Sequence, residues 1–128
     1  DFLLGVCESW MTPALFLSVT FIAGAVISFF TGSSWGTFAI CIPIAVPMAY
    51  SFTGGQLGTL VYAAVGAVVS GGLFGDHCSP VSDTSVLSSL GAACDHIDHV
   101  RTQLPYALLA AAVSIILWIV VALVGGAA

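Results

Sequence analysis

Two carboxylates and an imidazole share one short polar stretch of an otherwise almost uncharged chain. Asp76, His77 and Asp83 fall within residues 75–85, whereas 5% of the 128 residues are charged and 59% are hydrophobic. An ionisable group at membrane depth costs several kcal/mol unless it is paired, hydrated or bound to an ion, so it marks a functional site. A carboxylate can hold a small cation or a proton, and an imidazole can carry a proton near neutral pH. The stretch therefore predicts a cation site.

Further oxygen ligands lie in the same stretch. The hydroxyl groups belong to Ser79, Ser82 and Thr84. Gly75 and the pair Ser79-Pro80 should interrupt a helix and free backbone carbonyl groups, which coordinate small cations at the ends of half helices. We therefore expect Asp76 and Asp83 to be the sodium ligands, supported by these oxygens. The alternative is a polar loop outside the membrane, between two spans.

Two segments that contain histidine each have two possible functional interpretations. His77 could be a proton carrier or a neutral residue that hydrogen-bonds a freed carbonyl group. Residues 95–99 resemble a metal-ligand cluster by type, since they include Asp95, His96, Asp98 and His99. A solvated or interfacial polar face is the favoured interpretation of that cluster.

The overall composition predicts a multi-pass membrane protein of the inner cell membrane. Mean hydropathy is +1.15, and a Lys+Arg count of 1 argues against nucleic-acid binding through a basic patch. The four cysteines, Cys7, Cys41, Cys78 and Cys94, form no CxxC pair and are expected to be buried free thiols. The chain starts at Asp1 without an initiator methionine, which predicts a piece of a longer transporter.

Upstream of the polar stretch, two apolar runs flank a segment rich in hydroxyl groups. Residues 13–30 are just long enough to span a bilayer, whereas residues 38–50 are too short and contain Pro43 and Pro47. Residues 31–37 form the expected tip between them, with Thr31, Gly32, Ser33, Ser34 and Thr37. Two short arms around such a tip predict a re-entrant helical hairpin. Residues 13–30 could instead cross the membrane fully.

Downstream, the pattern predicts a discontinuous transmembrane helix. Residues 57–74 carry small side chains that permit close helix packing, and a half helix follows at residues 84–94 with Asp83 or Thr84 as its N-cap. Alternatively, residues 57–74 span alone and residues 84–94 are re-entrant. Residues 95–101 suit a short interfacial helix, and residues 104–124 a final transmembrane helix. The predicted fold class is an all-α polytopic membrane protein, with residues 1–128 as one partial transmembrane domain.

Three motifs strongly resemble the NhaC-type sodium/proton antiporter family. They are SGGLFGDHCSPVSDT at residues 70–84, DHIDHVRTQLPY at residues 95–106 and TGSSWGT at residues 31–37. The resemblance implies the C-terminal half of a transporter built from two inverted repeats. It assigns binding roles to Asp76, Ser79, Asp83 and Thr84 in the broken helix and to Thr31, Ser33, Ser34 and Thr37 in the tip.

The function expected from residues and resemblance together is exchange of sodium for protons by alternating access. Burial favours the neutral form of a carboxyl group and bound sodium favours its charged form, so the two ligands compete. A sodium-coupled carboxylate exchanger of the malate/lactate type, or an amino-acid carrier, is the alternative. The expected partners are sodium, protons, the lipid bilayer and the N-terminal repeat, with a homodimer left open. No cofactor is expected.

An enzyme is not expected. Intramembrane aspartyl proteases carry a Gly-x-Gly-Asp motif, and Leu73 stands here where its first glycine is required. A structural or interaction segment without transport activity is the remaining class for this chain alone.

Overall fold

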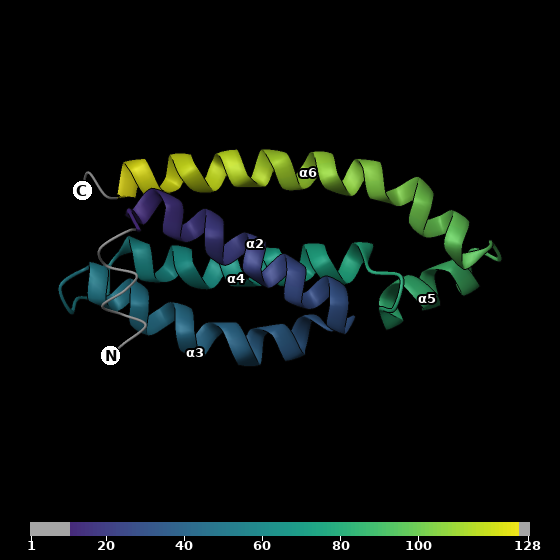
Figure 1. The fold of residues 1–128 in the computed structure, drawn as a ribbon, viewed down its shortest axis with the longest axis horizontal. Helices are drawn as coiled ribbons and strands as arrows, with labels where there is room; N and C mark the ends of the chain where they lie inside the picture. The colour runs from purple at the N-terminus through teal and green to yellow at the C-terminus, as the bar shows by residue number, and fades with distance from the viewer. Residues whose placement is uncertain (1–10, 126–128) are drawn as a thin grey trace.

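The computed structural model describes residues 11–125, which fold into helices joined by short loops (Figure 1). The helices are α2 (Pro13–Thr31), α3 (Ser34–Phe52), α4 (Thr59–Cys78), α5 (Asp83–Gly91) and α6 (His96–Gly125). Four of them, all except α5, are long and apolar enough to cross a membrane. These four run lengthwise through the molecule, and α5 lies at one end, beside the start of α6 (Figure 1).

The closest packing in the bundle joins α2 to α4. A Cβ atom added at Gly71 would collide with the carbonyl oxygen of Phe21, and one added at Gly75 would collide with that of Ala25. The hydroxyl of Ser28 donates a hydrogen bond of 2.6 Å to the carbonyl oxygen of Gly72. Glycine thus lets the two helices approach closely enough for the Ser28 side chain to reach the backbone of α4, as the small residues in this part of the sequence predict.

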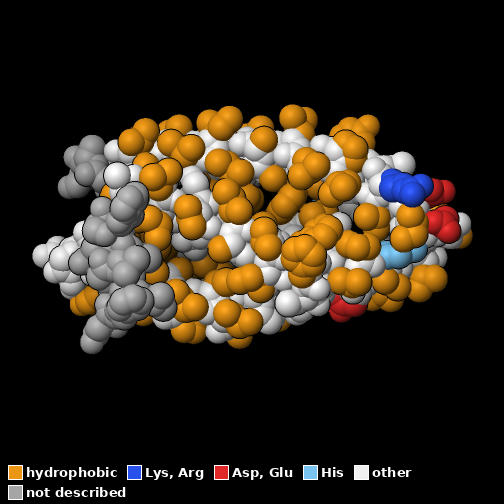
Figure 2. Space-filling view, in the orientation of Figure 1, with side chains coloured by type: hydrophobic (Ala, Val, Ile, Leu, Met, Phe, Trp, Pro, Cys, Tyr) orange, Lys and Arg blue, Asp and Glu red, His pale blue; other side chains and the backbone are white. Residues whose placement is uncertain are grey.

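The other two long helices pack on this pair and leave most of their surface outside. Ala45 and Ala49 of α3 and Ala111 and Ala122 of α6 are buried in the core. The indole nitrogen of Trp118 on α6 donates to the hydroxyl of Ser70 on α4 at 3.3 Å. Large apolar side chains cover the flank shown in Figure 2, and the charged and histidine side chains of that face gather at the α5 end. Such a surface suits lipid contact along the flank.

One expectation about α3 is wrong. The helix has 19 residues and continues through Pro43 and Pro47, whereas residues 38–50 were expected to form a short arm. It starts early because Ser33 caps it, with the Ser33 hydroxyl accepting a hydrogen bond from the backbone N–H of Gly36. Its length therefore gives no support to a re-entrant arm, and the re-entrant hairpin stays a prediction.

The short separate helix expected at residues 95–101 is also wrong. These residues belong to α6, which runs continuously for 30 residues with Pro105 inside it. The carboxylate of Asp95 accepts hydrogen bonds from the backbone N–H groups of Ile97 and Asp98, which starts the helix at this point. A single proline removes one hydrogen bond, and the helix continues on both sides of it.

The helix is interrupted at Ser79-Pro80 as predicted, but the interruption expected at Gly75 is wrong, because Gly75 lies inside α4. Helix α4 ends at Cys78 and α5 begins at Asp83, with Ser82 rather than Asp83 or Thr84 as the N-cap. The three cysteines among the described residues are free thiols, but the expected burial holds only for Cys78, since Cys41 is half-buried and Cys94 is exposed. Cys7 lies outside the described residues.

Candidate functional site

The two interruptions of the helical bundle touch each other. Gly32 ends α2 in the left-handed conformation, with φ of 66°, and a Cβ atom there would lie 2.8 Å from the carbonyl oxygen of Val81. The hydroxyl of Ser79 donates to the carbonyl oxygen of Phe29 at 2.6 Å. The loop between α4 and α5 therefore rests on the turn between α2 and α3.

Replacing Gly32 with alanine should destabilise this contact. The positive φ costs an L-residue about 1–2 kcal/mol, and the new methyl group would press on the backbone of Val81. Gly54→Ala is the matched control, since Gly54 has φ of 65° with nothing within 4 Å. In thermal unfolding of the complete protein in detergent, we expect a larger fall in Tm for Gly32→Ala than for Gly54→Ala. Equal falls would mean that the contact with Val81 contributes nothing.

Asp76 is a buried carboxylate at the end of α4. Its side chain is 7% exposed, and Oδ1 accepts a hydrogen bond of 2.7 Å from the hydroxyl of Ser82. The Ser82 hydroxyl in turn lies 2.6 Å from the hydroxyl of Thr84 and accepts from the backbone N–H of Thr84 at 3.2 Å. Ser82 therefore serves both as the N-cap of α5 and as a link between Asp76 and Thr84.

Asp83 has a different environment. It is exposed in the first turn of α5, where a carboxylate interacts favourably with the positive end of the helix dipole. Ser79 is buried and engaged with backbone groups, donating to Phe29 and accepting from the N–H of Val81. The break thus brings Asp76, Ser82 and Thr84 together, whereas Asp83 and Ser79 face other surroundings.

The hydroxyl groups expected at the hairpin tip mostly bond to their own helix ends. Thr31 donates to the carbonyl oxygen of Ile27, and Thr37 donates to that of Ser33. Ser33 caps α3, and Ser34 is buried. Such local hydrogen bonds satisfy the hydroxyl protons and leave oxygen lone pairs, so a role for these residues in cation binding stays a prediction.

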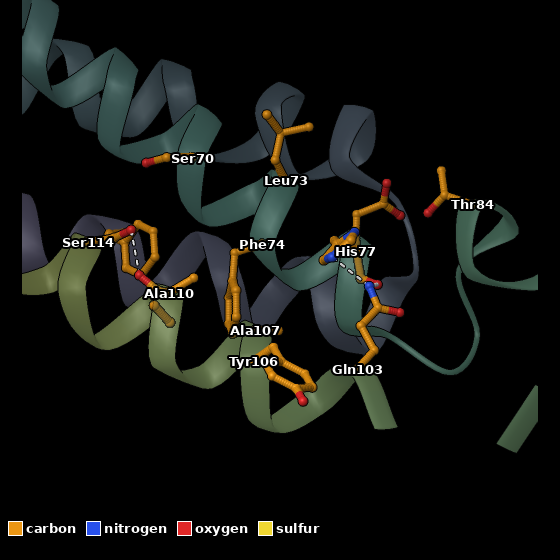
Figure 3. A pocket seen from close by; sticks show the side chains of 13 residues that line it. Ser70, Leu73, Phe74, His77, Thr84, Gln103, Tyr106, Ala107, Ala110 and Ser114 are labelled. Atoms are coloured by element: carbon orange, nitrogen blue, oxygen red, sulfur yellow. Dashed lines mark hydrogen bonds between the residues drawn. The ribbon is translucent and has the colours of Figure 1, made fainter. Parts of the chain in front are cut away.

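A cavity of about 600 Å³ opens beside Asp76 (Figure 3). Its polar end is lined by Asp76, His77, Thr84 and Gln103. Its apolar end runs along α6, past Tyr106 towards Ala110. The His77 side chain points to Gln103 of α6, and the carbonyl oxygen of His77 accepts from Ser85 and Gln103. The imidazole of His77 therefore pairs with an amide side chain instead of a freed carbonyl group.

Sequence reasoning missed the roles of two residues near this site. His96 bridges the break: its Nε2 donates to the carbonyl oxygen of Pro80 at 2.6 Å, and its Nδ1 lies 3.2 Å from the hydroxyl of Ser89. The signal that could have found His96 is the freed carbonyl group before α5, because a carbonyl group released from a helix needs another donor. The second residue is Gln103, whose contact with His77 joins segments far apart in the chain and leaves no local signal.

The metal-cluster alternative for residues 95–99 finds no support. Across residues 11–125, no group of three or more His, Cys, Asp or Glu side chains is placed to hold a metal ion. Asp95 caps α6, and His96 is occupied with Pro80 and Ser89. The favoured interpretation of a purely solvated face is incomplete too, because His96 makes these internal contacts.

The apolar helices and the polar break at the end of α4 define a multi-pass membrane protein. The model of the Na+/H+ antiporter family matches residues 2–123. The chain belongs to the Na+/H+ antiporter family, and this membership indicates a transporter rather than an enzyme.

Curated relatives agree with this assignment. The chain is 52% identical over 110 residues to an uncharacterised protein of Haemophilus influenzae, covering 85% of this chain and 20% of that protein. It is 36% identical to the malate-2H(+)/Na(+)-lactate antiporter of Bacillus subtilis, covering 89% and 23% of the two chains. It is 32% identical to the Na(+)/H(+) antiporter NhaC of Alkalihalophilus pseudofirmus, covering 88% and 23%. The chain thus spans about a fifth of the length of these relatives, and no solved structure matches it.

Proposed function

We propose that this chain is part of a secondary transporter that exchanges sodium ions for protons by alternating access. The observation that carries the proposal is the buried carboxylate of Asp76, which lies at a helix break beside a cavity and is hydrogen-bonded by Ser82. Membership of the Na+/H+ antiporter family supports the reaction class. The chain would contribute one part of the ion site, and the remaining length of the transporter would contribute the rest.

Asp76 would hold a sodium ion and a proton in turn. Sodium favours the charged carboxylate and a proton neutralises it, so one ligand displaces the other. The link to Ser82 and Thr84 suits both states because a hydroxyl can donate or accept. When Asp76 is charged, Ser82 donates to it; when Asp76 is protonated, its own O–H can donate to Ser82, and Ser82 to Thr84.

The other sodium ligands remain part of the proposal. Thr84 is close to Asp76 through Ser82, and the carbonyl groups at the ends of α4 and α5 supply further oxygens. The tip residues, Thr31, Ser33, Ser34 and Thr37, lie near the break through the contact of Gly32 with Val81. Asp83 would act mainly through its charge at the start of α5, since its side chain is exposed.

The test uses the complete protein in proteoliposomes that enclose a pH-sensitive dye. An imposed sodium gradient should drive protons in the opposite direction, and an equal potassium or choline gradient should not. Absence of a sodium-dependent pH change would contradict the proposal.

A second candidate is the sodium-coupled exchange of small carboxylates. The relative from Bacillus subtilis is a malate/lactate antiporter, and a cavity of about 600 Å³ is of the size that holds small organic molecules. Against it, the sole Lys or Arg of the chain, Arg101, is exposed and does not line this cavity. Uptake of labelled malate or lactate that requires sodium, with no proton movement in their absence, would favour this candidate.

A further inference from the structure

Gln103 has an orphaned amide oxygen. Its Oε1 is the one buried side-chain nitrogen or oxygen atom without a hydrogen-bond partner within residues 11–125. Its amide nitrogen donates to the carbonyl oxygen of His77 at 3.1 Å and also meets Nε2 of the His77 ring. A carbonyl oxygen can only accept, so this contact fixes which end of the amide faces His77. Figure 3 shows the amide nitrogen turned to His77 and the oxygen turned away.

An unpaired buried oxygen is costly. Leaving a buried acceptor unsatisfied costs about 1–3 kcal/mol, and such groups in native proteins commonly mark a water molecule or an ion. An amide oxygen is a pure acceptor and a ligand for hard cations. The Gln103 oxygen therefore has the chemistry of a cation ligand.

Gln103 also lies where two cavities meet. It lines the cavity of about 600 Å³ together with Asp76, His77 and Thr84. It lines a second, polar cavity of about 110 Å³ with His77 and Thr84 again. Gln103 therefore lines the same space as Asp76 and Thr84, although it comes from a different helix.

We propose that Oε1 of Gln103 is a ligand of the transported cation, in a site shared with Asp76 and Thr84, and that His77 positions the amide. This inference rests on the proposed function, because it assigns a further ligand to the same exchanged cation. It makes α6 part of the ion site, in addition to the broken helix α4–α5.

The contact with His77 positions the ligand. The ring and the backbone carbonyl oxygen of His77 both meet the amide nitrogen of Gln103. They therefore hold that end of the amide and leave its oxygen to face the cation.

The test compares Gln103→Met with the unaltered complete protein in proteoliposomes. Methionine keeps the length of the side chain and removes the oxygen. We expect the KM for sodium to rise about tenfold or more, the loss of about 1.4 kcal/mol of binding, while the maximal rate at saturating sodium changes little. The matched control is Thr102→Val, because the Thr102 hydroxyl bonds only to carbonyl groups of its own helix; its KM should not change.

Each outcome separates this inference from the proposed function. An unchanged KM in Gln103→Met, with normal exchange by the unaltered protein, overturns the inference alone. Absence of sodium-dependent proton flux in the unaltered protein overturns the proposed function and the inference with it. If the methionine variant does not fold, the same rise in the KM for sodium is expected for Gln103→Asn. Its side chain is one methylene group shorter, which moves the amide oxygen away from the cation.

The positioning role of His77 has its own readout. In His77→Ala the amide of Gln103 loses its contact with the ring, so the KM for sodium should rise while the maximal rate at saturating sodium changes little. An unchanged KM would overturn the role of His77. The Thr102→Val control should keep the original KM.

Discussion

Asp76→Asn should abolish sodium-dependent proton movement by the complete protein. Asparagine has nearly the same shape, and its side-chain oxygen can still accept the hydrogen bond from Ser82. It can neither carry a negative charge nor exchange a proton, so the competition between the two ions disappears. The measurement is the sodium-driven pH change in proteoliposomes, with Tm recorded for the same preparation. A loss of flux at unchanged Tm would assign the defect to chemistry.

Two other aspartates serve as comparisons for this variant. Asp98→Asn removes an exposed carboxylate in the first turn of α6 and should retain exchange. Asp83→Asn tests the second candidate carrier, and we expect a partial reduction because Asp83 is exposed at the start of α5. Full exchange by Asp76→Asn, or complete loss in Asp83→Asn alone, would transfer the central role away from Asp76.

Gly75→Ala should be the most damaging single methyl group added to the bundle. The new Cβ would collide with the carbonyl oxygen of Ala25 and lie 2.8 Å from the backbone nitrogen of Phe29. Both are backbone atoms of α2, so relief requires the helices to separate. Overpacking of this kind costs about 1–3 kcal/mol, and sometimes more. Because Asp76 is the next residue, the same displacement should disturb its hydrogen bond with Ser82 and reduce transport.

The matched substitution is Gly91→Ala at the end of α5. Gly91 is helical, and a methyl group added there would have nothing within 4 Å, so alanine should be tolerated. The comparison is Tm in detergent together with the initial rate of sodium-driven proton flux. Similar Tm values for the two variants would show that the approach of α2 to α4 is less tight than the glycine contacts indicate.

The helix break could be predicted from the sequence, whereas the length of α3 could not. Ser79-Pro80 stops a helix by local chemistry, and this chemistry is visible in the sequence. The hydroxyl groups of residues 34–37 favour a polar tip when hydropathy alone is considered. Thr37 instead bonds to the carbonyl oxygen of Ser33, one turn earlier, which lets a hydroxyl residue enter an apolar helix. Hydropathy does not show whether a hydroxyl group will bond to a carbonyl group of its own helix.

The candidate site was only partly predictable for a similar reason. Spacing marked Asp76 and Asp83 equally, but the direction of α5 after the break decides which of them is buried. The partners of the break come from residues far along the chain, since Pro80 meets His96 and His77 meets Gln103. Such contacts depend on how α6 folds back, and no local pattern of residues encodes that packing.

The hydroxyl-to-carbonyl bonds between α2 and α4 have a consequence for movement. The Ser28 hydroxyl on α2 donates to the carbonyl oxygen of Gly72 on α4 at 2.6 Å. The hydroxyl of Ser79, the residue that follows α4, donates to the carbonyl oxygen of Phe29 on α2, also at 2.6 Å. Sliding one helix past the other would break both bonds and force the glycine contacts apart, so the pair should behave as a single rigid body. Any cycle that opens Asp76 first to one side of the membrane and then to the other must therefore swing α2 and α4 together. The hinges of that motion then belong to the helices packed around this pair.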